Sequence, residues 1–102
     1  MDALYPGKYI FTRAVPARVF KPSQLRVLTT ATKIVPYAPK RSGLLLLNTG
    51  VATAFIGQDQ TVNTRTSFPL VGGAALTIND YTGELWGIAT APVTLGIIET
   101  EL

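Results

Sequence analysis

Short runs of alternating apolar and polar residues recur along the chain, and none keeps the 3.6-residue period of an amphipathic helix beyond two turns. In residues 93–100, Val93, Leu95 and Ile97 are predicted to face one way and the intervening residues the other. This is the pattern of a half-buried sandwich strand. The run Leu44 to Leu47 is apolar on both faces, so it is predicted to be central in a sandwich or buried at a subunit interface.

Gly, Asn, Asp and Pro residues separate these runs and favour turns. We expect strands at residues 25–35, 43–48, 52–57, 67–71, 74–79, 84–90 and 93–100. Successive strands are expected to pair as antiparallel hairpins, with Gly72-Gly73 as one hairpin turn. The sequence therefore predicts an all-β fold, a small antiparallel β-sandwich or jelly-roll-like domain with an extended N-terminal arm.

Prolines at positions 6, 16, 22, 36 and 39 prevent a long helix near the N-terminus, because proline lacks an amide donor and restricts its predecessor. We expect residues 1–22 to form an extended arm and residues 23–102 to form the β-sandwich domain. The arm would dock on a protein partner through its basic and aromatic residues, which are Tyr5, Lys8, Tyr9, Phe11, Arg13, Arg18, Phe20 and Lys21. Two alternatives remain: a plain first strand, and an arm that binds nucleic acid. Binding to nucleic acid is the least favoured alternative, because the lysine and arginine residues of the arm are spaced singly and not clustered.

Charge is divided unevenly along the chain. Eight basic residues and one acidic residue precede position 42, whereas one basic and five acidic residues follow it, so the two parts carry +7 and −4. The two parts can therefore attract each other, within one subunit or between subunits.

Only 15% of the 102 residues are charged, against roughly 25% in an average globular protein. A monomer with so little charge is expected to expose apolar area, which favours a homo-oligomer, either a dimer or a trimer. No apolar run approaches the roughly 20 residues of a membrane span, and the N-terminus does not resemble a secretory signal. We therefore expect no membrane association and synthesis in a host cytoplasm.

The chain contains no cysteine and no histidine, which removes the usual nucleophile and base pairs of hydrolases and the commonest transition-metal ligands. We expect no enzymatic activity, no cofactor and no bound metal. The segment 79–84 superficially suggests a calcium loop but lacks the alternating oxygen ligands of an EF-hand. Trp86 is expected in the core or at an interface, and Tyr81 at a turn tip is expected to be exposed. The alternative is that Trp86 and the tyrosines form a platform for a sugar or base.

A series of turn and core segments resembles small structural proteins of tailed bacteriophages. The segments are Leu44-Leu45-Leu46-Leu47-Asn48-Thr49-Gly50, Ala54-Phe55-Ile56-Gly57, Ser67-Phe68-Pro69-Leu70, Gly72-Gly73, Leu76-Thr77-Ile78 and Glu84-Leu85-Trp86-Gly87-Ile88-Ala89. The resemblance spans residues 42–99, and no functional residue is carried over from it.

This resemblance implies a structural role in a virion, at the capsid surface. The leading hypothesis is a capsid decoration (cement) protein that binds and stabilises the lattice of the major capsid protein. The alternatives are another virion component, such as a tail, neck or fibre accessory protein, and a carbohydrate-binding or receptor-binding module. The expected partners are the major capsid protein or other virion proteins.

Overall fold

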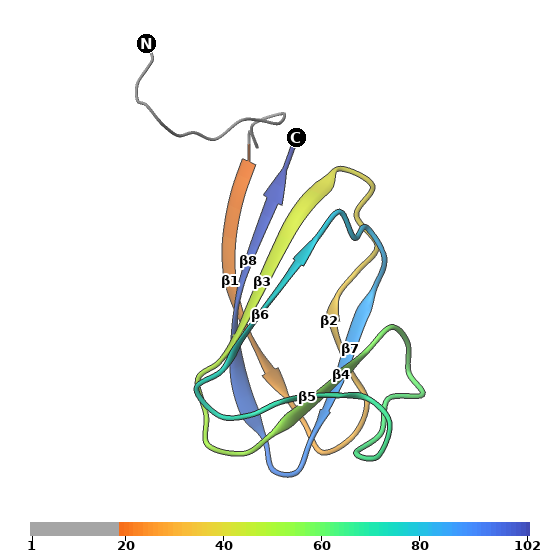
Figure 1. Ribbon diagram of the computed structural model, residues 1–102, viewed down its shortest axis with the longest axis vertical. Helices are drawn as coiled ribbons and strands as arrows, with labels where there is room; N and C mark the ends of the chain where they lie inside the picture. Colours follow the sequence, from red (N-terminus) through yellow and green to blue (C-terminus); the bar gives the residue numbers. More distant parts are fainter. Residues whose placement is uncertain (1–18) are drawn as a thin grey trace, which may run out of the picture.

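A computed structural model describes residues 19–102, which form eight β-strands and no helix (Figure 1). The strands are β1 (Val19–Val27), β2 (Thr32–Val35), β3 (Arg41–Asn48), β4 (Ala54–Gly57), β5 (Phe68–Leu70), β6 (Ala75–Asn79), β7 (Leu85–Ala89) and β8 (Val93–Glu101). The predicted all-β class is confirmed.

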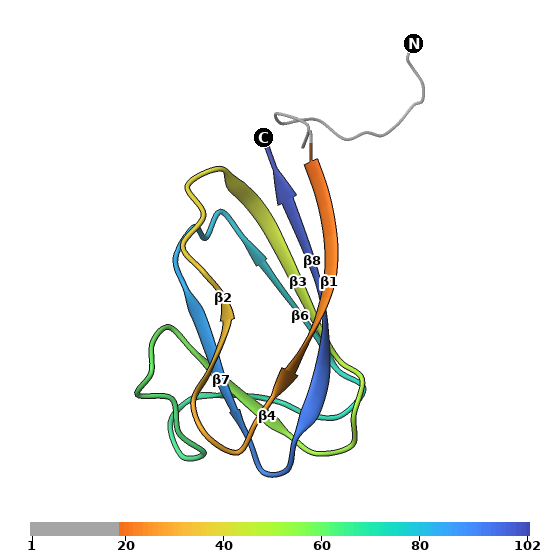
Figure 2. The ribbon, with the colours of Figure 1, turned by 180° about the vertical axis from the view of Figure 1, so that it is seen from behind.

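The strands form two four-stranded antiparallel sheets, with the orders β1-β8-β3-β6 and β2-β7-β4-β5, and the two sheets face each other (Figure 1). Figure 2 shows the same two layers from behind. The antiparallel partners nest, since β1 pairs with β8, β2 with β7, β3 with β6 and β4 with β5. Eight strands nested in this way across two sheets define a jelly roll. The prediction of a small sandwich of this kind is confirmed.

The predicted hairpin pairing of successive strands is wrong, except between β4 and β5. Gly72 and Gly73 do not form a hairpin turn but connect β5 to β6 in the opposite sheet. A Cβ at Gly72 would lie 2.5 Å from the Gly50 carbonyl oxygen, and Gly73 has a φ of 83°. The glycines are therefore required by a close backbone approach and a left-handed residue in an inter-sheet connection.

The predicted strand at 25–35 is also wrong, because β1 and β2 occupy it and lie in different sheets. A corner separates them, where the Thr32 hydroxyl donates to the Thr30 carbonyl and accepts from the Leu28 amide. Thr and Val residues continue through this corner, so the alternating pattern conceals it.

Strand β1 begins at Val19, so residues 19–22 of the predicted arm belong to the sheet of the domain. Pro22 is accommodated because β1 is an edge strand, where a missing amide donor is tolerated.

The core lies between the sheets. Val27, Leu46 and Leu95 are fully buried there, from three adjacent strands of the first sheet. Leu44 also faces the core, whereas Leu45 and Leu47 alternate to the outside. The run 44–47 therefore belongs to β3, which lies between two other strands of its sheet, and its outward residues Leu45 and Leu47 are apolar as well. No helix within residues 19–102 is long and apolar enough to cross a membrane.

Candidate interaction surfaces

The outer face of the first sheet carries no charged side chain across twelve neighbouring positions. Its strands alternate, so residues between the core positions point outward. The register aligns these residues in three rows across β1, β8, β3 and β6. The rows are Phe20-Thr100-Gly43-Asn79, Pro22-Ile98-Leu45-Thr77 and Gln24-Gly96-Leu47-Ala75. We call these twelve residues the uncharged face.

The uncharged face has two hollows, each at a glycine, where no side chain fills the surface. A hollow of about 230 Å³ lies at Gly96, bordered by Pro22, Leu45 and Leu47. A second hollow of about 200 Å³ lies at Gly43. The Leu47 side chain stands beside the first hollow and is 40% exposed. An apolar projection therefore lies next to an apolar depression in the same row.

The outer face of the second sheet is also apolar but carries one charged pair. Trp86 and Ile88 of β7 point outward beside Phe55 of β4. The Trp86 indole Nε1 donates to Glu84 Oε1 at 2.9 Å, and Lys33 Nζ lies 3.2 Å from Glu84 Oε2 and 5.5 Å from the centre of the Trp86 ring. These contacts hold the indole in one orientation, and the Trp86 bond, followed by the contact with Lys33, lowers the pKa of the Glu84 carboxyl.

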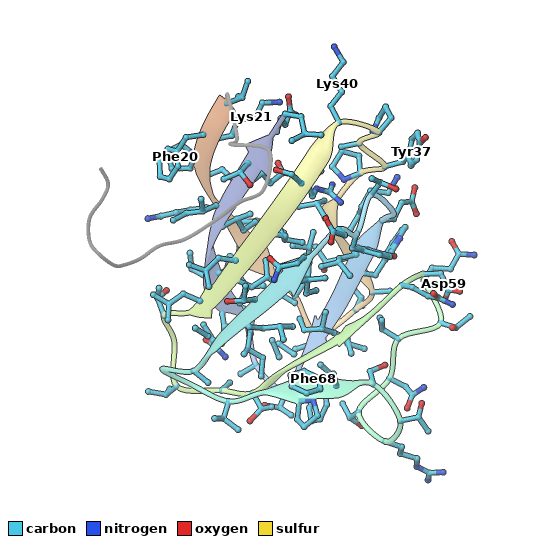
Figure 3. The ribbon with its side chains drawn as sticks, turned by 45° about the horizontal axis from the view of Figure 1, so that its top comes forward. Phe20, Lys21, Tyr37, Lys40, Asp59 and Phe68 are labelled. Atoms are coloured by element: carbon cyan, nitrogen blue, oxygen red, sulfur yellow. The ribbon has the colours of Figure 1, made fainter. Side chains whose placement is uncertain are left out.

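Trp86 was expected in the core or at an interface, and it does not lie in the core, because its side chain is half-buried on this outer face; its place at an interface stays a prediction. Gly87, its neighbour in β7, is the residue that faces inward, where a Cβ would lie 2.9 Å from Ile34. Tyr81 packs against the core, so its predicted exposure is also wrong. The exposed aromatic residues of the described chain are Phe20, Tyr37 and Phe68 (Figure 3).

One end of the sandwich is closed by a buried arginine. The side chain of Arg41 is fully buried, and its Nε donates to Glu99 Oε2 at 2.8 Å. Its terminal nitrogens donate to the carbonyl oxygens of Tyr81, Gly83 and Pro36 at 3.1, 2.9 and 2.6 Å. The segment 79–84 therefore directs its carbonyls at a guanidinium.

Three ion pairs within residues 19–102 join a basic residue before position 42 to an acidic residue after it: Lys21 with Glu101, Lys33 with Glu84 and Arg41 with Glu99. Three of the eight basic residues before position 42 are thus paired with acidic residues of the second part inside one chain. The Lys21 pair, at 2.8 Å, raises the pKa of the lysine through its hydrogen bond to Glu101. None of these residues belongs to the uncharged face.

The loop between β4 and β5 borders a polar hollow of about 350 Å³. Its polar groups bond to one another: Asp59 Oδ1 accepts from the Thr61 amide and hydroxyl, and Asn63 Oδ1 accepts from the Arg65 and Thr66 amides. The Thr61 hydroxyl, and then its amide, lower the pKa of Asp59. Residues 19–102 contain no group of three or more His, Cys, Asp or Glu residues that could hold a metal ion.

Of the predicted docking residues, Phe20 and Lys21 lie within the structure, both in β1. Phe20 is 66% exposed and points away from the sandwich at the border of the uncharged face (Figure 3). Lys21 lies toward the other side of β1 and is paired with Glu101. The remaining ones, which are Tyr5, Lys8, Tyr9, Phe11, Arg13 and Arg18, lie outside the described residues.

Sequence reasoning missed the uncharged face. The run 44–47, apolar on both faces, was a partial sign of this face in the sequence. The residues that β1, β6 and β8 add to it can be identified only from the register of strand pairing. No family model, curated protein or solved structure matches this chain.

Proposed function

We propose that the protein is a non-enzymatic structural component of a tailed-phage virion, which decorates the capsid by binding the major capsid protein. The observation that carries this proposal is the jelly-roll arrangement of the eight strands, with the orders β1-β8-β3-β6 and β2-β7-β4-β5 in two facing sheets. Jelly rolls recur in viral capsid and lectin domains, and the residue resemblance over 42–99 favours the former.

Identifying the chain in purified particles tests this proposal. Mass spectrometry of virions from a phage that encodes it should detect the protein at many copies per particle. Imaging of labelled particles should place it on the capsid. A position on the tail, neck or fibre would favour the alternative virion roles, and absence from particles would contradict all of them.

The docking role of the N-terminal segment is part of the same proposal and rests on its basic and aromatic residues. Deletion of residues 2–17 leaves β1 whole, because the strand begins at Val19. We expect the shortened protein to fold and to lose particle binding, as measured by co-sedimentation with undecorated capsids. Unchanged binding would assign docking to the sandwich instead.

A deletion that extends to residue 20 provides the matched comparison. It removes Val19 and Phe20, which pair with Glu101 and Thr100 of β8. This longer deletion should also lower the thermal stability of the domain, whereas the deletion of 2–17 should not. The comparison separates a loss of docking from a loss of strand pairing.

A carbohydrate-binding module is the second candidate, favoured by the fixed orientation of Trp86 opposite Gly57 on the outer face of the second sheet. Aromatic faces stack on sugar rings. A glycan array should then show binding that Trp86→Ala abolishes and Tyr37→Ala preserves, since Tyr37 lies in the connection between β2 and β3. No binding on the array would eliminate this candidate.

A further inference from the structure

We infer that the uncharged face binds the same face of a second copy of the chain, in a two-fold dimer. This inference goes beyond the proposed virion role and does not depend on it, because it rests on the shape and charge of the face alone. We identify the binding partner as a second copy because the uncharged face is complementary in shape to itself, as a two-fold interface between identical surfaces requires.

The order of strands produces this complementarity. A two-fold axis that runs along the strands, midway between β8 and β3, places β8 of one copy opposite β3 of the other, and β1 opposite β6. Leu47 and Gly96 share one row of the register, so the axis brings Leu47 of each copy over the hollow at Gly96 of the other. In the next row, Ile98 of each copy lies opposite Leu45.

Charge is compatible with this arrangement. Residues near a two-fold axis meet their own kind, so a charge at the centre would face a like charge at a cost. None of the twelve positions is charged, and the ion pairs of Lys21 and Arg41 lie outside the face. Arg26, on the edge strand β1, would approach the β6 side of the second copy and not the other Arg26.

The area of the face sets the expected strength of the contact. Each outward residue of a strand covers about 6.6 by 4.8 Å of a sheet, so the twelve residues of one face span about 380 Å² and two faces about 760 Å². This total is smaller than the about 1,000 Å² at which stable specific interfaces begin. We therefore expect a weak, reversible dimer at tens of micromolar.

Sedimentation equilibrium of the full chain tests the inference. The wild type should have twice the monomer mass of 10.9 kDa. Leu47→Asp should weaken association by more than about tenfold, since it places a charge in each hollow. Val51→Asp is the matched control, because Val51 is 98% exposed and lies in the connection between β3 and β4, outside the twelve residues of the face. It should leave the dimer intact.

Gly96→Leu separates the dimer from the fold. A Cβ at position 96 would lie 3.9 Å from Leu47 Cβ, an ordinary contact, so the monomer should tolerate the substitution. The new side chain fills the hollow and should abolish dimerisation while circular dichroism remains unchanged. A monomeric or trimeric wild type, or a dimer that both Leu47→Asp and Gly96→Leu leave intact, would overturn the inference.

Crosslinking between introduced cysteines tests how the two copies are oriented in the dimer. The crosslinks are selective because the sequence contains no cysteine of its own. Gln24 and Ala75 lie in one row, on β1 and β6, so the axis places Gln24 of one copy opposite Ala75 of the other. A short bismaleimide should join a mixture of Gln24→Cys and Ala75→Cys chains. It should not join either variant to itself, because like strands lie about 14 Å apart sideways. Equal crosslinking of one variant alone would overturn the arrangement. Particle binding is a separate readout, so failure of the dimer and failure of the virion role are distinguishable.

Discussion

Replacing the buried arginine is the sharpest test of what holds one end of the sandwich together. Arg41 is the first residue of β3, and it contacts the connection before β3, the connection between β6 and β7, and the end of β8. Arg41→Met keeps a long apolar stem but removes all four hydrogen bonds. We expect this variant to unfold at lower denaturant concentration and lower temperature than the wild type.

The magnitude follows from which partners remain. Breaking a buried ion pair by removing one member costs about 3–5 kcal/mol, because the other member stays unpaired. Here Glu99, whose side chain is 18% exposed, and three backbone carbonyls lose their donors. The carbonyls cannot be removed by substitution, so even an apolar replacement of both charged residues leaves them unsatisfied. For a domain of this size, a loss of about 3 kcal/mol lowers the Tm by at least about 12 °C.

Chemical denaturation and calorimetry measure this loss, and Glu99→Gln is the control. The glutamine keeps an oxygen acceptor for Arg41 Nε and leaves the three carbonyl bonds in place. Its effect should therefore be smaller than that of Arg41→Met. A loss below about 1 kcal/mol for Arg41→Met would refute the reasoning, because it would mean that water replaces the guanidinium at these carbonyls without penalty.

Three further predictions concern single side chains. Asn48→Ala should cost about 3 kcal/mol in denaturation, because the buried amide bonds two carbonyls and an amide. Gly57→Ala should lower the Tm, since its Cβ would lie 2.5 Å from Val62 Cγ1. The lowered pKa of Glu84 means that its stabilising contribution is present above the ordinary glutamate pKa and is lost as pH falls through the folded value. Fluorescence of Trp86, the only tryptophan, should therefore change below that ordinary pKa, and Glu84→Gln should abolish the change.

Strand positions could be predicted after residue 42 because local pattern determines them. The six strands β3 to β8 end within two residues of their predicted limits. Asn48-Thr49-Gly50 was a turn signal in the sequence, and in the structure Asn48 completes that turn by accepting from the Gly50 amide. A short polar side chain that bonds its own backbone is a local device, so it is visible without the fold.

Strand partners and buried polar contacts could not be predicted in the same way. The alternation of apolar and polar residues in β8 predicts that one face of the strand is buried, but it does not indicate that β1 and β3 are the neighbouring strands. Arg41 lies between the predicted strands 25–35 and 43–48, and the sequence does not mark it as buried, because its acceptors at residues 36, 81, 83 and 99 are brought together only by the two sheets. The pairing of basic and acidic parts of the chain was visible as a possibility, but not which residues pair.

The same distinction between local pattern and register determines how the interaction surfaces can be tested. Phe20 and Pro22 were grouped with the N-terminal arm because proline and aromatic residues continue across position 19, yet their register places them in the uncharged face. A truncation that passes residue 18 therefore alters the arm, the first strand and the proposed dimer face together. Deleting residues 2–17 and substituting Leu47 or Gly96 change separate parts of the chain. If the deletion and the substitutions both lower particle binding, the dimer contributes to docking by presenting two arms on one assembly. If only the deletion lowers particle binding, a single arm is sufficient for docking.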